Sequence, residues 1–147
     1  MNPIITASLT GPAALRKDTP AMPRTPEEIA DAAKAAYEAG AAVLHIHLRD
    51  NDMFTADLEV AKRTVEAVRA KCGGIIQLST GGGMPYEERM KIVEAKPAMA
   101  TLNPASMTMG DNEFLNPPKM MYKLAERMLE LGIKPEIEIY DTGHIPL

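Results

Sequence analysis

The amino-acid sequence predicts an α/β protein, and more specifically the first part of a (β/α)8 TIM barrel. Five short apolar runs alternate with four segments of helical character, which is the pattern of a parallel sheet covered by crossover helices. The runs also carry polar side chains at every second position, so each strand has one polar and one apolar face. We interpret residues 1–147 as a single domain that supplies about five strands and four helices of such a barrel.

The strands are expected near residues 4–9, 42–48, 75–78, 98–102 and 136–140. In the second strand His45 and His47 share one face, and Leu44 and Ile46 share the other. The polar faces of the remaining strands carry Thr6, Ser8 and Thr10, then Gln77 and Ser79, then Thr101 and Asn103, and finally Glu136, Glu138 and Tyr140.

This division into polar and apolar faces favours a closed barrel over an open, doubly wound sheet. A parallel sheet with helices on both faces has continuous apolar strands, because a buried polar group without a partner costs about 1–3 kcal/mol. In a closed barrel the polar faces point into the lumen and converge at the C-terminal mouth. The alternative is a metal-free, flavodoxin-like doubly wound domain whose polar faces bond each other or water. Since a whole barrel needs about 200–250 residues, we expect this chain to stop after the fifth strand.

The helices carry local signals. Thr25-Pro26-Glu27-Glu28 is a capping box that predicts a helix as far as Gly40,. A third helix is expected from near Pro85, and the fourth follows Asn116-Pro117,. The second and fourth helices have apolar stripes at spacings of three and four, formed by Leu58, Ala61, Val65 and Val68 and by Met121, Leu124, Met128 and Leu131,. We interpret the 11 methionines as core packing,.

Composition excludes several classes of protein. The net charge is −4 and the 16 basic residues are scattered, so no nucleic-acid partner is expected. No apolar run approaches the length of about 20 residues that spans a bilayer, and the first residues do not resemble a signal peptide. Cys72 is the single cysteine, which suits a reducing compartment. The sequence therefore predicts a soluble, cytoplasmic protein.

His45 and His47 form the strongest candidate metal site. Two imidazoles two residues apart on one strand face can occupy neighbouring positions around one ion. Zinc fits such nitrogen ligands, and nickel, cobalt or iron would also accept them. A third ligand is needed, for which Glu136, Glu138 and His144 are candidates. The alternative is a hydrogen-bonded structural pair.

A glycine-rich turn follows the third strand. Residues 79–83, Ser-Thr-Gly-Gly-Gly, offer amides and hydroxyls that could hold a carboxylate or phosphate, although a tight turn that merely needs glycine is the alternative. Thr101, Asn103 and Thr10 stand at corresponding strand ends. Glu138 is either a general base, a metal-orienting group or an ion-pair partner of Arg49.

Together these segments resemble the β-keto acid cleavage enzymes, the family of 3-keto-5-aminohexanoate cleavage enzyme. The resemblance covers the whole chain and rests on residues 10–11, 25–28, 38–41, 45–50, 77–82, 99–103 and 135–140. His-x-His-x-Arg-Asp followed by Ser-Thr-Gly-Gly is its most specific feature.

The resemblance implies a zinc-dependent (β/α)8 barrel, usually a homotetramer, that condenses a β-keto acid with acetyl-CoA to give acetoacetate and a new acyl-CoA. It implies that His45 and His47 bind the metal, that Ser79, Gly82 and Thr101 contact the substrate, and that Glu138 supports catalysis. It assigns the third ligand and a late arginine and aspartate to positions beyond residue 147.

The sequence departs from the family pattern at two places. The glutamate that recognises the substrate amino group corresponds to Ala13, so a less cationic β-keto acid is expected. Residues 50–54 replace a usual Gly-Arg-Pro turn. Because the fragment lacks the late residues, it is expected to be incomplete as an enzyme. The second hypothesis is a catalytically incompetent half barrel that serves as a binding or assembly module.

Overall fold

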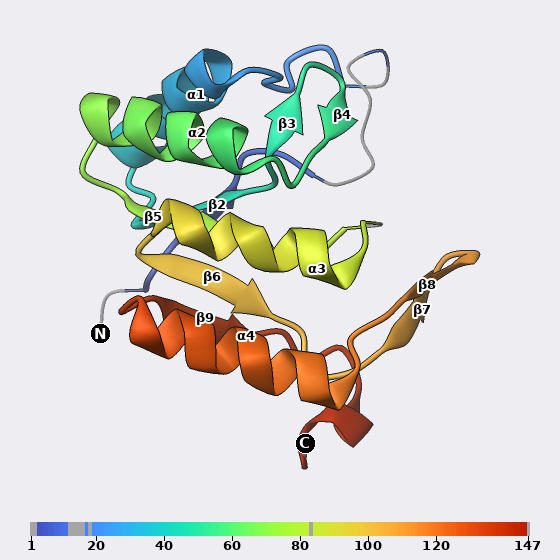
Figure 1. The fold of residues 1–147 in the computed structure, drawn as a ribbon. Coiled ribbons are helices and arrows are strands. Elements are labelled where there is room, and N and C mark those ends of the chain that lie inside the picture. Colours follow the sequence, from blue (N-terminus) through green and yellow to red (C-terminus); the bar gives the residue numbers. More distant parts are fainter. Residues whose placement is uncertain (1–2, 12–16, 18, 83, 147) are drawn as a thin grey trace.

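The computed structural model describes residues 3–11, 17, 19–82 and 84–146, and it shows a parallel five-stranded sheet with helices along one side (Figure 1). The strands lie side by side in the order β1 (Thr6–Ser8), β2 (Val43–Ile46), β5 (Ile75–Leu78), β6 (Met99–Leu102) and β9 (Lys134–Ile137). The crossovers are α1 (Pro26–Glu38), α2 (Leu58–Lys71), α3 (Tyr86–Arg89) continued by the 3₁₀ helix η1 (Met90–Ala95), and α4 (Pro118–Glu130). A short 3₁₀ helix, η2 (Thr142–His144), follows β9. None of these described helices is long and apolar enough to cross a membrane.

The helices form one layer. Each strand pairs in parallel with the next along the chain, and right-handed crossovers between such neighbours all leave from the same side of the sheet. Helices in succession contact each other, α1 with α2, α2 with η1 and η1 with α4. Within the described residues the doubly wound alternative is therefore wrong, because it needs helices on both faces. The arrangement matches an incomplete α/β barrel.

Capping side chains start the first two helices. Thr25 Oγ1 accepts from the Glu28 amide at 3.2 Å, as the capping box predicts,. The Glu28 carboxylate accepts from the Arg24 amide at 2.8 Å, one residue before the predicted partner. Asp57 caps α2 by accepting from two amides of its first turn,.

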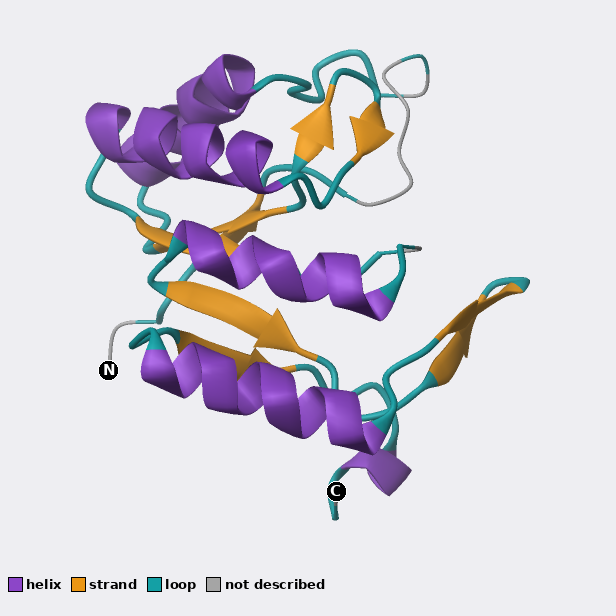
Figure 2. Cartoon of the chain, in the orientation of Figure 1, coloured by secondary structure: helices purple, strands orange, loops and turns teal. Residues whose placement is uncertain are grey.

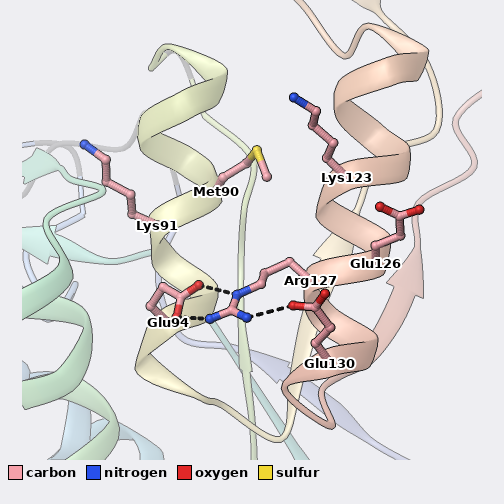
Figure 3. A pocket seen from close by; sticks show the side chains of 7 residues that line it. All are labelled: Met90, Lys91, Glu94, Lys123, Glu126, Arg127 and Glu130. Carbon is pink, nitrogen blue, oxygen red and sulfur yellow. Dashed lines mark hydrogen bonds and ion pairs between the residues drawn. The ribbon is translucent and has the colours of Figure 1, made fainter.

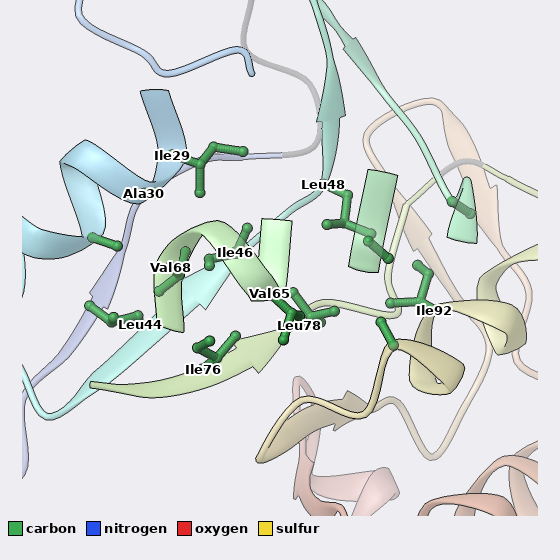
Figure 4. Close-up of a cluster of buried hydrophobic side chains, with 14 of the residues drawn as sticks. Ile29, Ala30, Leu44, Ile46, Leu48, Val65, Val68, Ile76, Leu78 and Ile92 are labelled. Carbon is green, nitrogen blue, oxygen red and sulfur yellow. The ribbon is translucent and has the colours of Figure 1, made fainter. Parts of the chain in front are cut away.

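The apolar strand faces lie beneath the helices. Leu44, Ile46 and Leu78 are fully buried against α1 and α2, where they pack with Ile29 and Val65 (Figure 4). A second cluster joins β6 to α4 through Ala100, Met121, Leu124 and Met128. Both predicted apolar stripes are therefore confirmed, and Met121 and Met128 are core residues. The interpretation of all the methionines as core packing is wrong, because Met53 and Met109 are exposed.

An ion-pair bridge joins η1 to α4 at the surface. Arg127 donates to both oxygens of Glu94, at 2.6 and 2.8 Å, and to Glu130 at 2.7 Å (Figure 3). A shallow hollow of about 350 Å³ lies around this bridge. Because its side chains are exposed and paired with one another, the bridge contributes little to stability and we assign no ligand to the hollow.

Two antiparallel hairpins were not predicted. They consist of β3 (Arg49–Asp50) with β4 (Met53–Phe54), and of β7 (Met107–Met109) with β8 (Asn112–Phe114) (Figure 2). Asn51 supplies the left-handed residue of the first turn, at φ 54°, a conformation that asparagine tolerates. This hairpin contains residues 50–54, where the sequence departs from the pattern of the family that it resembles.

The fifth strand was predicted two residues too late. It spans Lys134–Ile137 rather than residues 136–140. Its partner β6 ends at Leu102, and the last ladder bond runs from the Glu138 amide to the Leu102 carbonyl at 3.0 Å. Beyond that point the described chain has no neighbouring strand with which to pair.

Replacing Leu124 by alanine should lower the free energy of unfolding by about 2–5 kcal/mol, since the side chain is 1% exposed and a cavity would remain,. Leu129→Ala on the same helix is the control, because Leu129 is 71% exposed and its loss should change stability by less than about 0.5 kcal/mol,. Urea denaturation followed by circular dichroism measures both. Equal losses would contradict the assignment of the core.

Candidate metal and substrate site

A cavity of about 540 Å³ opens on the polar face of the sheet, at the carboxyl ends of the strands. Its lining residues from the strand ends are His45, His47, Ser79, Gly81, Gly82, Asn103 and Glu138. The hairpin β7–β8 contributes Met109, Asn112 and Phe114 to one wall. Five of the predicted site residues therefore share one cavity.

The two histidines point their Nε2 atoms at each other across 3.2 Å. Gln77, paired with His45 across β2 and β5, accepts at Oε1 from His45 Nδ1 at 2.7 Å. This bond holds the proton on Nδ1 and leaves the lone pair of Nε2 directed toward His47. The pair is therefore arranged either to share a ligand or to form one hydrogen bond.

The environment of His47 keeps its imidazole neutral. Burial, followed by the charges of His45 and Arg49, lowers the pKa of His47 from 6.5 to about 4. Its backbone is held by Thr10, whose hydroxyl donates to the His47 carbonyl at 2.7 Å and accepts from the His47 amide at 2.8 Å. A neutral, fixed imidazole is the form that binds metals.

The turn after β5 is tightly organised. The Gly81 amide donates to Ser79 Oγ at 3.1 Å. Thr80 donates from its hydroxyl to the Thr101 carbonyl at 2.8 Å, and its amide donates to Thr101 Oγ1 at 2.9 Å. Thr101, predicted as a substrate contact, is fully buried behind the turn, where it supports the residues that line the cavity.

Gly82 is required by its surroundings. It adopts φ +127°, and a Cβ there would lie 2.2 Å from Cε1 of Phe54. The Phe54 ring stands 5.9 Å, centroid to centroid, from that of His47. The β3–β4 hairpin thus places an aromatic ring next to both His47 and Gly82.

Glu138 is held by one neighbour. Asn103 Nδ2 donates to Glu138 Oε2 at 2.6 Å. Burial raises the pKa of Glu138 above its usual 4.5, against the opposing effects of the Asn103 bond and the His45 charge. Of the three roles open to Glu138, the ion pair with Arg49 is not seen among the described residues; that guanidinium donates to the carbonyls of Gly11 and Asp52.

Two other candidate ligands lie elsewhere. Glu136 is not among the residues that line the cavity. His144 borders a separate apolar hollow with Ile137 and Ile139, and its Nδ1 accepts from the Tyr140 amide at 3.4 Å. Among the described residues no group of three His, Cys, Asp or Glu is close enough to hold a metal. Ala13 lies outside the described residues.

Several residues of the site were not predicted from the sequence. Gln77 was placed on the polar face, but its bond to His45 was not predicted because it depends on the register of two strands. Phe54, Met109, Asn112 and Phe114 belong to the unpredicted hairpins. Asn103 was recognised only as a residue at a strand end.

Unsatisfied polar atoms surround the cavity. His47 Nδ1, Gln77 Nε2 and Asn103 Oδ1 are buried without a hydrogen-bond partner in the described part of the chain. Such atoms are rare in folded proteins and mark places where a ligand or ordered water completes the bonding. Their position supports a binding function for this polar face.

Comparison with known proteins gives the family. A family model described as beta-keto acid cleavage enzyme matches residues 3–147. The chain belongs to the β-keto acid cleavage enzyme family. This confirms the resemblance to the β-keto acid cleavage enzymes that the sequence motifs indicated.

Individual relatives are similar to this chain over almost all of its length. The chain is 42% identical to 3-keto-5-aminohexanoate cleavage enzyme of Fusobacterium nucleatum, over 97% of its own length and 54% of the relative. It is 40% identical to the enzyme of the same name from Acetoanaerobium sticklandii, over 98% and 55%. It is 36% identical to 3-oxoadipate:acetyl-CoA acetyltransferase of Cupriavidus necator, over 97% and 51%. The chain thus spans about half the length of these relatives.

The Gly82→Ala variant should lose about 1–3 kcal/mol of unfolding free energy or displace Phe54, because the new methyl would overlap the ring and glycine alone tolerates this φ,. Gly11→Ala is the control, since a Cβ there meets no described residue within 4 Å. Thermal unfolding of both variants is the measurement. A Gly82→Ala protein as stable as Gly11→Ala would show that the contact is not restrictive.

Proposed function

We propose that this chain contains the metal-binding and carboxylate-binding part of an acetyl-CoA-dependent β-keto acid cleavage site. In this reaction the carboxymethyl unit of the keto acid joins the acetyl group to give acetoacetate, and the remaining acyl group leaves on coenzyme A. The observation that carries the proposal is the convergence of His45 and His47 Nε2 beside the Ser79–Gly82 turn, in one cavity.

The donor pair fits a divalent transition metal, and we propose zinc. Two nitrogens bound to a tetrahedral zinc ion at about 2.0–2.1 Å lie about 3.3–3.4 Å apart, close to the 3.2 Å between the two Nε2 atoms. Gln77 acts as the outer partner that orients His45,. A bound metal would polarise the keto carbonyl and stabilise the enolate. The family resemblance assigns the third ligand to a position beyond residue 147.

The turn after β5 would bind the carboxylate of the keto acid. Ser79 and Gly82 line the cavity together with the histidines, and the bonds from Thr80 to Thr101 hold the turn rigid. Hydroxyl and backbone amide groups of such a turn are suitable donors for an anion. We propose that Thr101 acts on the substrate through this turn.

Glu138 would act as a proton acceptor and orienting group. Asn103 holds one carboxylate oxygen, and the other has no hydrogen-bond partner among the described residues. Because burial raises the pKa of Glu138, its basicity exceeds that of an exposed carboxylate. Activity that needs the ionised form should fall as the pH drops through this raised pKa.

The keto acid itself is assigned only by class. The named relatives act on an amino keto acid and on 3-oxoadipate, which differ in the group distal to the keto carbonyl. Since Ala13 replaces the glutamate that the resemblance links to an amino group, we propose a β-keto acid without a distal ammonium group.

Metal analysis of the full natural protein should find about one zinc per chain, which His45→Ala and His47→Ala each abolish. His144→Ala is the matched control, because His144 borders another hollow and its loss should leave the zinc content unchanged. Inductively coupled plasma mass spectrometry gives the ratio. Full zinc content in both site variants would mean that the histidines form a structural pair.

Glu138→Gln should lower kcat by about 10²-fold or more while the metal content stays constant, since a positioned acid–base group contributes factors of this size. Glu136→Gln is the control two residues away, and it should retain kcat. The assay is the acetyl-CoA-dependent formation of acetoacetate by the full natural protein. A full-length protein inactive toward a panel of β-keto acids would refute the proposed function.

A further inference from the structure

Arg89, the last residue of α3, is buried in an unusual setting. Its side chain is 3% exposed and its guanidinium carbon lies 5.1 Å from the ring centroid of Tyr86 and 4.7 Å from that of Phe114. It forms no ion pair within the described residues, and Glu87, the acid that acts on it electrostatically, is exposed. Among the residues that the structure describes, this buried cation therefore has no carboxylate partner.

Neutral oxygens from two segments surround this cation. Nη1 donates to the Thr80 carbonyl at 3.1 Å, and Nη2 donates to the Leu115 carbonyl at 2.7 Å. Both nitrogens donate to Asn116 Oδ1 at 3.2 Å. The guanidinium thus ties the turn after β5, which lines the cavity, to the segment that directly follows the β7–β8 hairpin, another part of the cavity wall.

The arrangement leaves net positive charge behind the turn. Carbonyl oxygens satisfy hydrogen bonds but supply only partial charge, and a buried unpaired charge is costly to a fold. Arginine nevertheless stays protonated when buried. The bond to the Thr80 carbonyl places this charge directly beside the Ser79–Gly82 turn, whose Ser79, Gly81 and Gly82 line the cavity, and charges at short range interact strongly where the effective dielectric is low.

We propose that Arg89 is a positioning residue that fixes the Ser79–Gly82 turn against the β7–β8 hairpin and, by its uncompensated charge, favours the substrate carboxylate at that turn. The proposal rests on the proposed function, because it names the group that prepares the carboxylate site. If Arg89 had a purely structural role, the opposite result is expected. A carboxylate introduced beside the guanidinium would then stabilise the fold and leave substrate binding unchanged.

Asn116→Asp tests this distinction in the full natural protein, because it places a carboxylate at the atom that already accepts from Arg89. The KM for the β-keto acid should rise on the order of tenfold as the charge is neutralised, whereas kcat should change by less than about threefold because a nonreacting contact binds ground and transition states alike. The zinc content should not change.

Two controls accompany this variant. Asn116→Ala loses the same donor bonds from Nδ2 to the Ala105 and Phe114 carbonyls, so it should lower the melting temperature. It adds no carboxylate beside Arg89, so KM should stay within about threefold of the wild-type value. Ala35→Glu, on the exposed face of α1, makes the same change in net charge and should leave KM unchanged.

A second comparison does not depend on Asn116. Arg89→Lys keeps the charge with fewer donors, and Arg89→Met removes it, so the KM of the methionine variant should exceed that of the lysine variant on the order of tenfold. Equal KM values in this pair, or equal effects of Asn116→Asp and Asn116→Ala, would overturn the proposal.

Calorimetric titration with acetoacetate separates this inference from the proposed function. If the wild type binds acetoacetate but turns over no β-keto acid, the proposed function fails, and weaker binding by Asn116→Asp than by Asn116→Ala still supports the role of Arg89. If turnover is present and the variants bind acetoacetate equally, Arg89 has no electrostatic role and the proposed function stands.

Discussion

The alternation of side chains along β2 determines both the core and the site. Leu44 and Ile46 are fully buried beneath the helices, so His45 and His47 must occupy the other face, since successive side chains of a strand point in opposite directions. A slip of one residue would exchange the two pairs. The apolar burial that stabilises the sheet therefore also fixes where the imidazoles stand, and the register with β5 places Gln77 beside His45.

A different kind of interaction holds the turn after β5, which lines the cavity together with the histidines. The turn after β5 depends on polar bonds between distant segments, from Thr80 to Thr101 and from Arg89 to Thr80 and Asn116. Such networks are stable only when their members are satisfied, because each bond is strengthened by a low local dielectric that also penalises an unmade one. The turn after β5 is consequently sensitive to single polar substitutions. The position of the histidines on β2 is sensitive instead to changes in the volume of the core side chains.

Periodicity could predict the parts of the fold that repeat over several residues. The order of strands and helices, the stripes of α2 and α4, and the polar face with His45 and His47 all followed from it. The hairpins did not, because strands of two or three residues are too short to show alternation; Asn51 and Gly110, both at positive φ, were the only local signals. The fifth strand was misplaced because alternation continues to Tyr140, while pairing stops where β6 ends.

The same distinction explains how one scaffold can support relatives named for different keto acids. The histidine pair is set by strand register alone, so it tolerates little variation in position. The hairpin β7–β8 faces the cavity from outside the sheet, and its pairing places Met109 and Asn112 opposite each other, where both line the cavity. Substitutions there alter the shape and polarity of the wall without disturbing the histidine pair, because they touch neither the register nor the helix layer. The bonds from Arg89 to Thr80, Leu115 and Asn116 keep the segment after the hairpin fixed relative to the Ser79–Gly82 turn while the lining residues change.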